Sequence, residues 1–157
     1  MARFRYSMQS ILDIKLKMET QAKQEFSAAR AALDEEERKL TQLFDRKAAY
    51  EEEGRRLLSG TLNLRDIEDN KAAILCMDDF ILKQKECVRV AENNLERARV
   101  KLTEVMKERK THETLKEKAF AQYLEDEKRQ EGKEVDELTS YTYGQRKKQE
   151  DKTEVPM

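Results

Sequence analysis

The sequence predicts an all-α fold in which two long helices of unequal length pair as an antiparallel coiled-coil hairpin. Charged residues make up 41% of the 157 residues and aromatic residues 6%, so the chain holds too little apolar material for a compact multi-layer core. One proline and four glycines leave long uninterrupted stretches, and apolar residues recur in them every three or four positions, as helices require. The expected core is therefore a thin seam between two helices.

The first helix is predicted over about residues 7–58. Its apolar positions are Met8, Ile11, Met18, Ala22, Phe26, Ala29, Leu33, Leu40, Leu43, Tyr50 and Leu57. From Phe26 onward the steps alternate between three and four residues, which is the heptad rhythm, whereas the step from Ala22 to Phe26 resembles a stutter. Ser59 and Gly60 end the helix and open a turn over 59–62.

The second helix is predicted over about residues 63–141, with Thr61 or Asn63 as its N-cap. One heptad position holds Ile74, Ile81, Val88, Leu95, Leu102, Arg109, Lys116 and Tyr123, and the other holds Met77, Gln84, Ala91, Ala98, Val105, His112 and Ala119. Charged and polar residues thus replace leucine and valine in the last third of the seam. We expect the hairpin to cover residues 5–143 and residues 144–157, which show no apolar period, to form a disordered tail.

The short turn makes the helices antiparallel, so residues whose numbers sum to about 121 face each other, because both helices rise equally per residue. The polar part of the seam, Arg109, His112 and Lys116, then lies at the open end, where the first helix is only beginning. Residues 118–143 extend beyond it. Few intramolecular layers depend on this region, so its charge is interpreted as a face for another protein.

Nothing in the sequence indicates catalysis or a cofactor. His112 is the single histidine and has no second soft ligand beside it. Phosphate-binding loops, zinc-protease motifs and nucleophiles with an adjacent base are absent from the sequence. We therefore expect no enzyme, no metal site, no cofactor and no small-molecule substrate.

Charge and hydropathy argue against nucleic acid as a partner and against a membrane-spanning segment. The net charge is −1 and basic residues alternate with acidic ones, which argues against nucleic acid. No apolar run approaches the roughly 20 residues of a membrane span, and the N-terminal stretch has no signal-peptide core. A cytoplasmic protein is expected, in which Cys76 and Cys87, about 16 Å apart along one helix, stay free thiols.

Two motifs resemble those of the flagellar export protein FliJ family. "FRYSMQSILDIKLKMETQAKQEF" (4–26) has the aromatic pair and the Met-Gln-x-Ile-Leu run of its N-terminal signature. "ERKTHETLKEKAFAQYLEDEKRQEGKEVDEL" (108–138) is similar to its C-terminal signature. The resemblance implies a hairpin like the central stalk of a rotary ATPase, and a soluble component of the flagellar type III export apparatus. Its implied place is cytoplasmic, peripheral at the inner face of the membrane.

The resemblance also implies partners and site residues. The partners would be the hexameric export ATPase, the cytoplasmic domain of the export-gate membrane protein and, for some members, export chaperones. The positions that match the ATPase-facing motifs are Phe4, Met8, Ile11, Arg109, Lys110, Glu113, Lys116 and Lys118. Candidates for the gate contact, inferred from their position near the turn, are Leu43, Tyr50, Ile74, Met77 and Ile81. The alternatives are a generic coiled-coil adaptor or scaffold and the equivalent stalk of a virulence type III secretion system.

Overall fold

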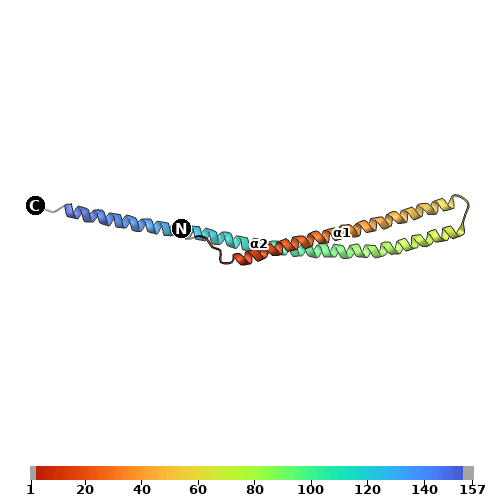
Figure 1. Cartoon of the computed structure of the whole chain (residues 1–157), viewed down its shortest axis with the longest axis horizontal. Coiled ribbons are helices and arrows are strands. Elements are labelled where there is room, and N and C mark those ends of the chain that lie inside the picture. Colours follow the sequence, from red (N-terminus) through yellow and green to blue (C-terminus); the bar gives the residue numbers. More distant parts are fainter. Residues whose placement is uncertain (1–2, 154–157) are drawn as a thin grey trace. The chain divides into compact units, whose positions relative to one another are not determined.

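Residues 3–153, the part of the chain that the computed structural model describes, form two helices and no strand (Figure 1). α1 spans Gln9–Leu58 and α2 spans Leu64–Thr153. The helices pack against each other as a hairpin, which confirms the predicted fold class. The chain divides into two compact units, which we call the hairpin unit (Lys15–Arg109) and the terminal unit (Met1–Ile14 with Lys110–Met157).

Residues 59–63 connect α1 to α2, where the sequence predicts a turn over 59–62, and side chains cap both helix ends. The Ser59 hydroxyl donates to the carbonyl of Arg56 at 2.8 Å and satisfies an orphan acceptor at the end of α1. The Asn63 side-chain oxygen accepts from the backbone N–H of Arg65 at 3.1 Å and of Asp66 at 3.4 Å. Asn63, rather than Thr61, is therefore the N-cap of α2.

The seam of the hairpin unit follows the predicted heptads on α2. The buried apolar residues of α2 are Met77, Ile81, Ala91 and Val105, each about 6% exposed. All four lie at the two heptad positions read from the sequence. In Figure 1 the two helices run side by side through this unit.

On α1 the N-terminal part of the seam differs from the prediction. Leu12, Glu19 and Ala22 are buried, whereas Ile11 and Met18 are 37% and 39% exposed. Counted from Phe26 backward, steps of four and three residues lead through Ala22 and Glu19 to Lys15 and Leu12. The heptad is therefore continuous and contains no stutter. Hydropathy does not reveal it, because the charged residues Lys15 and Glu19 fill two of its positions.

Two side-chain amides on α2 bond to the backbone of α1 and set the register of the hairpin. Asn70 Nδ2 donates to the carbonyl of Tyr50 at 2.8 Å, and Gln84 Nε2 donates to the carbonyl of Glu36 at 2.9 Å. Both pairs match the expected sum rule within about one residue. Gly54 makes room for the first contact, since a Cβ there would lie 2.6 Å from Asn70 Oδ1. Polar seam residues of this kind specify register.

In the terminal unit, α2 continues beyond the predicted end of the hairpin. Every residue from 128 to 153 is exposed. The sequence predicts a disordered tail from residue 144, whereas the structure continues α2 through 144–153; residues 154–157 lie outside the described residues. The difference has a local cause, because Gln, Arg, Lys and Glu dominate 145–152 and are strong helix formers despite the missing apolar period.

Candidate functional site

An aromatic cluster holds the residues before α1 against α2 in the terminal unit. The Phe4 ring centroid lies 5.1 Å from that of Phe120 in an edge-on arrangement and 5.2 Å from that of Tyr123. Phe120 and Tyr123 stack with centroids 6.2 Å apart. Such pairs add about 0.5–1.5 kcal/mol beyond the area they bury. Phe4, predicted to face an ATPase, is half-buried in this cluster and anchors its own segment.

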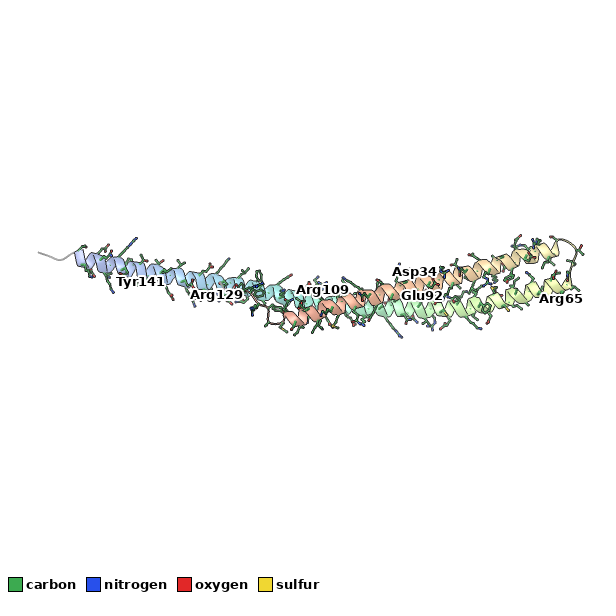
Figure 2. The ribbon with its side chains drawn as sticks, viewed as in Figure 1. Asp34, Arg65, Glu92, Arg109, Arg129 and Tyr141 are labelled. Carbon is green, nitrogen blue, oxygen red and sulfur yellow. The ribbon has the colours of Figure 1, made fainter. Side chains whose placement is uncertain are left out.

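Charged residues meet across the seam at one end of the hairpin unit. Arg109 Nε donates to the carboxylate of Glu19, and Lys23 Nζ lies 3.2 Å from the other oxygen of the same carboxylate. Nearby, Lys15 bonds to Glu108 at 2.9 Å. Arg109 is labelled in Figure 2, where α2 lies beside α1. The charge at this seam position is thus matched inside the molecule, and Arg109 is not simply presented to a partner.

Glu19 is the buried acid of this cluster, with 7% of its surface exposed. Desolvation would raise the pKa of its carboxyl. Hydrogen bonds from Lys23 and Arg109, together with their positive charges, outweigh that effect and hold the pKa below its ordinary value. Glu19 is therefore ionised at neutral pH and depends on both cations, since a buried carboxylate left without them would be costly.

The outward surface of the terminal unit combines cations with apolar side chains. Lys110 and Lys118 are exposed, whereas Glu113 and Lys116 are half-buried. Met8 and Ile11 are 40% and 37% exposed. Of the eight residues predicted to face an ATPase, all but Arg109 fall within this unit.

His112 occupies the seam of the terminal unit, as its heptad position predicts. Its side chain is half-buried, and its Nδ1 atom is buried without a hydrogen-bond partner in the described structure. An unpaired polar atom costs stability where an apolar residue would not. Its position on the heptad could be read from the sequence, but its missing partner could not.

The five residues predicted to contact an export gate lie in the hairpin unit. Met77 and Ile81 are buried in the seam, so neither side chain is available on the surface. Leu43, Tyr50 and Ile74 are half-buried. Heptad positions face the opposite helix, which is why a choice based on them selects residues that are buried or half-buried.

Other apolar side chains form the outward surface of the turn-proximal half. Those most exposed are Phe44, Leu58, Leu62, Leu64, Leu75, Phe80 and Leu82, between 44% and 74%. Lys85 Nζ lies 5.7 Å from the Phe44 ring centroid, within reach of a cation–π interaction. Leu75 and Leu82, one heptad apart, share the face of α2 that points away from the seam. In the sequence, these exposed residues can be recognised as apolar residues that occupy neither of the two seam positions.

Within residues 3–153, we find no cluster of three or more His, Cys, Asp or Glu residues placed to bind a metal ion. In the same part of the chain, neither helix has a stretch that is both long and apolar enough to cross a membrane. Cys76 and Cys87 are both exposed and unpaired with each other.

A family model and a solved structure are similar to nearly the whole chain. Residues 4–148 match the family model described as "Flagellar FliJ protein". Among solved structures, a protein described as a YscO homologue, CT670 from Chlamydia trachomatis, superposes with a TM-score of 0.70 and 28% sequence identity, covering 93% of this chain and 99% of that one. A comparison with curated proteins finds no significant match.

Proposed function

Because the chain belongs to the FliJ family and is a non-enzymatic stalk component of type III export, we propose that it binds and stimulates the hexameric flagellar export ATPase and links it to the export gate. The observation that carries this proposal is a family match over residues 4–148 on a hairpin whose terminal unit presents cations and apolar side chains together. The protein would act in the cytoplasm at the inner face of the membrane.

The ATPase contact is assigned to the exposed residues of the terminal unit. Lys110 and Lys118 supply charge, and Met8 and Ile11 supply exposed apolar surface. Methionine is enriched in protein interfaces, whereas lysine is depleted from their centres, so the two lysines are assigned to the polar rim of the contact, where a charged contact can be remade as a ring changes state. Arg109 is better regarded as a positioning residue, because its guanidinium bonds to Glu19 within the hairpin unit.

The test is stimulation of ATP hydrolysis by the purified export ATPase. The variant Lys110→Glu with Lys118→Glu should lose most of the stimulation while its helical circular dichroism stays unchanged. The matched control reverses two exposed cations of the hairpin unit, Arg30→Glu with Arg97→Glu. Full stimulation by the first variant, or equal loss by both, would contradict the assignment.

The gate contact is assigned to the turn-proximal half of the hairpin unit. Leu75 and Leu82 are each 69% exposed, and exposed apolar side chains on one helix face are a common feature of docking surfaces. The half-buried Leu43, Tyr50 and Ile74 would contribute their outer edges, whereas Met77 and Ile81 would support the helix from inside.

Binding to the cytoplasmic domain of the gate protein, measured by calorimetry, tests this contact separately. Leu75→Glu with Leu82→Glu should weaken binding at least about tenfold, since two apolar contacts are lost. Val90→Glu with Val100→Glu places the same charges at exposed valines farther from the turn and serves as the control. Equal affinities for the two variants would exclude a turn-proximal contact.

The equivalent stalk of a virulence type III secretion system is the second candidate, because the structural neighbour is described as a YscO homologue. Deletion of the gene in the source cell separates the two. Loss of flagellar filaments with intact effector secretion supports the flagellar assignment, and the reverse result supports the virulence system.

A further inference from the structure

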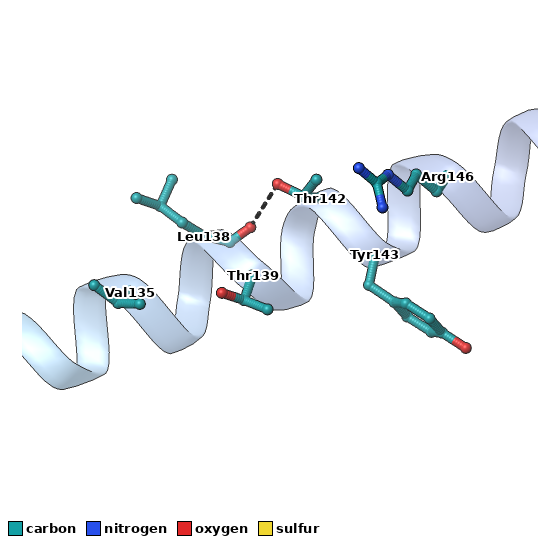
Figure 3. A pocket seen from close by; sticks show the side chains of 6 residues that line it. All are labelled: Val135, Leu138, Thr139, Thr142, Tyr143 and Arg146. Carbon is teal, nitrogen blue, oxygen red and sulfur yellow. Dashed lines mark hydrogen bonds between the residues drawn. The ribbon is translucent and has the colours of Figure 1, made fainter.

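A groove runs between α1 and α2 beside the turn, within the half of the hairpin unit to which the gate contact is assigned. Its volume is about 390 Å³, and both helices line it, from Glu51 to Leu58 on α1 and from Ile67 to Ile74 on α2. The hollow in Figure 3, by contrast, is lined by six residues that all belong to α2. The groove near the turn, which we call the Gly54 groove, therefore has two walls from different helices that can enclose a partner's side chain.

Most of the surface of the Gly54 groove is apolar. Leu57, Ile67 and Ile74 are half-buried, and Leu58 is 64% exposed. On α1, Gly54 precedes Leu58 by one helical turn and contributes no side chain to the wall. Insertion of another apolar group would remove the remaining apolar surface from water, which is the main driving force for most protein association.

The charged residues that line the groove are not all matched inside the molecule. Arg55 pairs with Glu52 at 2.7 Å, and Glu51 lies 3.9 Å from Lys47. Lys71 is exposed and forms no ion pair with any residue that the structure describes. An occupant of the groove therefore meets one uncompensated positive charge at its edge, which favours a carboxylate there and disfavours a cation.

We infer that the Gly54 groove takes a large apolar side chain of the gate protein's cytoplasmic domain, and that an acidic residue beside it in that domain pairs with Lys71. The inference rests on the proposed gate contact and extends it from the face of α2 into the space between the helices. Leu75 lies one helical turn after Lys71 on the same face of α2. One amphipathic segment with apolar and acidic residues thus spans the groove, Lys71 and the exposed Leu75.

Calorimetric titration of the full-length chain with the gate protein's cytoplasmic domain, at several salt concentrations, tests the charge at the groove. Lys71→Glu should weaken binding at least about threefold at low salt, because an attraction becomes a repulsion. It should also reduce the weakening of binding by salt, which a purely structural defect would not do. The matched control is Arg65→Glu, which reverses an exposed cation on a different face of α2 and should leave the affinity unchanged; Arg65 is labelled in Figure 2.

A second pair of variants tests the apolar insertion. Leu58→Ser removes part of the apolar wall and should weaken binding at least about threefold. Leu62→Ser is the control, because Leu62 is 61% exposed, much like Leu58, but does not line the groove. Both side chains are exposed, so the helical circular dichroism of both variants should match that of the unmodified chain.

A charge exchange identifies the acidic residue of the partner. When acidic residues of the gate domain are changed to lysine one at a time, one change should restore the binding lost in Lys71→Glu. Unchanged affinity of Lys71→Glu or of Leu58→Ser, or the lack of a restoring exchange, overturns the inference and leaves the gate contact on Leu75 and Leu82 in place. Tighter binding by Lys71→Glu overturns it as well and indicates a basic occupant. An unmodified chain that does not bind the gate domain at all overturns the proposed gate contact itself, so the two failures are distinguishable.

Discussion

Replacement of Gly54 by alanine should fail to stabilise the hairpin, although alanine is the better residue in a helix interior. Gly54 lies inside α1, opposite Asn70 of α2. A Cβ at this position would come within 2.6 Å of Asn70 Oδ1, closer than real contacts allow. The Asn70 side chain would have to move, and its 2.8 Å hydrogen bond to the carbonyl of Tyr50 would be lost or distorted.

Two opposing terms determine the size of the effect. Glycine to alanine in a helix interior contributes about 0.8–1 kcal/mol to the free energy of unfolding. Losing a hydrogen bond costs about 0.5–1.5 kcal/mol, and forcing a side chain off its rotamer costs about 0.5–1.5 kcal/mol more. Gly54→Ala alone should therefore range from neutral to about 2 kcal/mol destabilising.

Gly54→Ala should stabilise the hairpin once the Asn70 side chain is removed. In an Asn70→Ala background, where the crowded amide is absent, Gly54→Ala should raise the free energy of unfolding by about 0.8–1 kcal/mol. Urea unfolding of the four proteins in this cycle, followed by far-UV circular dichroism, measures the coupling. An equal gain from Gly54→Ala in both backgrounds would refute the argument that glycine is required for the Asn70 contact.

Three further predictions concern the seam and the exposed helix. The pKa of Glu19 in the folded state lies below its ordinary 4.5, so its contribution to the free energy of unfolding is present above that pH and is lost as the pH falls through the lowered value. Glu19→Gln should therefore reduce the loss of stability at acid pH, measured by urea unfolding at a series of pH values. An unchanged loss at acid pH would show that other acidic residues dominate it. His112→Leu should raise the free energy of unfolding by about 1–3 kcal/mol, because the unpaired Nδ1 atom is removed; thermal unfolding checks the sign, and a loss of stability would indicate a partner for this imidazole. Gly132→Ala, where a Cβ meets nothing within 4 Å, should stabilise the local helix by about 0.8–1 kcal/mol and slow amide hydrogen exchange around it; unchanged exchange rates would mean that this segment is not helical in solution.

On α2 the periodicity of the sequence was sufficient to find the core. Met77, Ile81, Ala91 and Val105 were predicted at seam positions and are buried. Each is apolar and each repeats at the heptad spacing, so hydropathy and position indicate the same face. The end of α1 and the start of α2 were also predictable, because Ser59 and Asn63 carry local capping signals.

On α1 hydropathy alone was misleading. Ile11 and Met18 are apolar but exposed, and Glu19 is charged but buried. A charged residue becomes a seam residue when the opposite helix supplies its counter-ion, and Arg109 does so from a position far along the chain. The candidate gate residues illustrate the same limit of sequence patterns. Met77 and Ile81 were chosen from the heptad pattern, which identifies core residues and not surface residues.

By itself, the sequence determined the all-α hairpin, its turn and the heptad face of α2, because these features depend on residues within about one or two helical turns of each other. The family motifs near both ends of the chain are likewise read from consecutive residues. Only the tertiary structure decided that Arg109 is engaged by Glu19, that Gly54 accommodates Asn70, and which of the apolar side chains near the turn remain on the surface. These features depend on which side chains of the opposite helix lie within a few ångströms, and the spacing of residues along one helix does not contain that information.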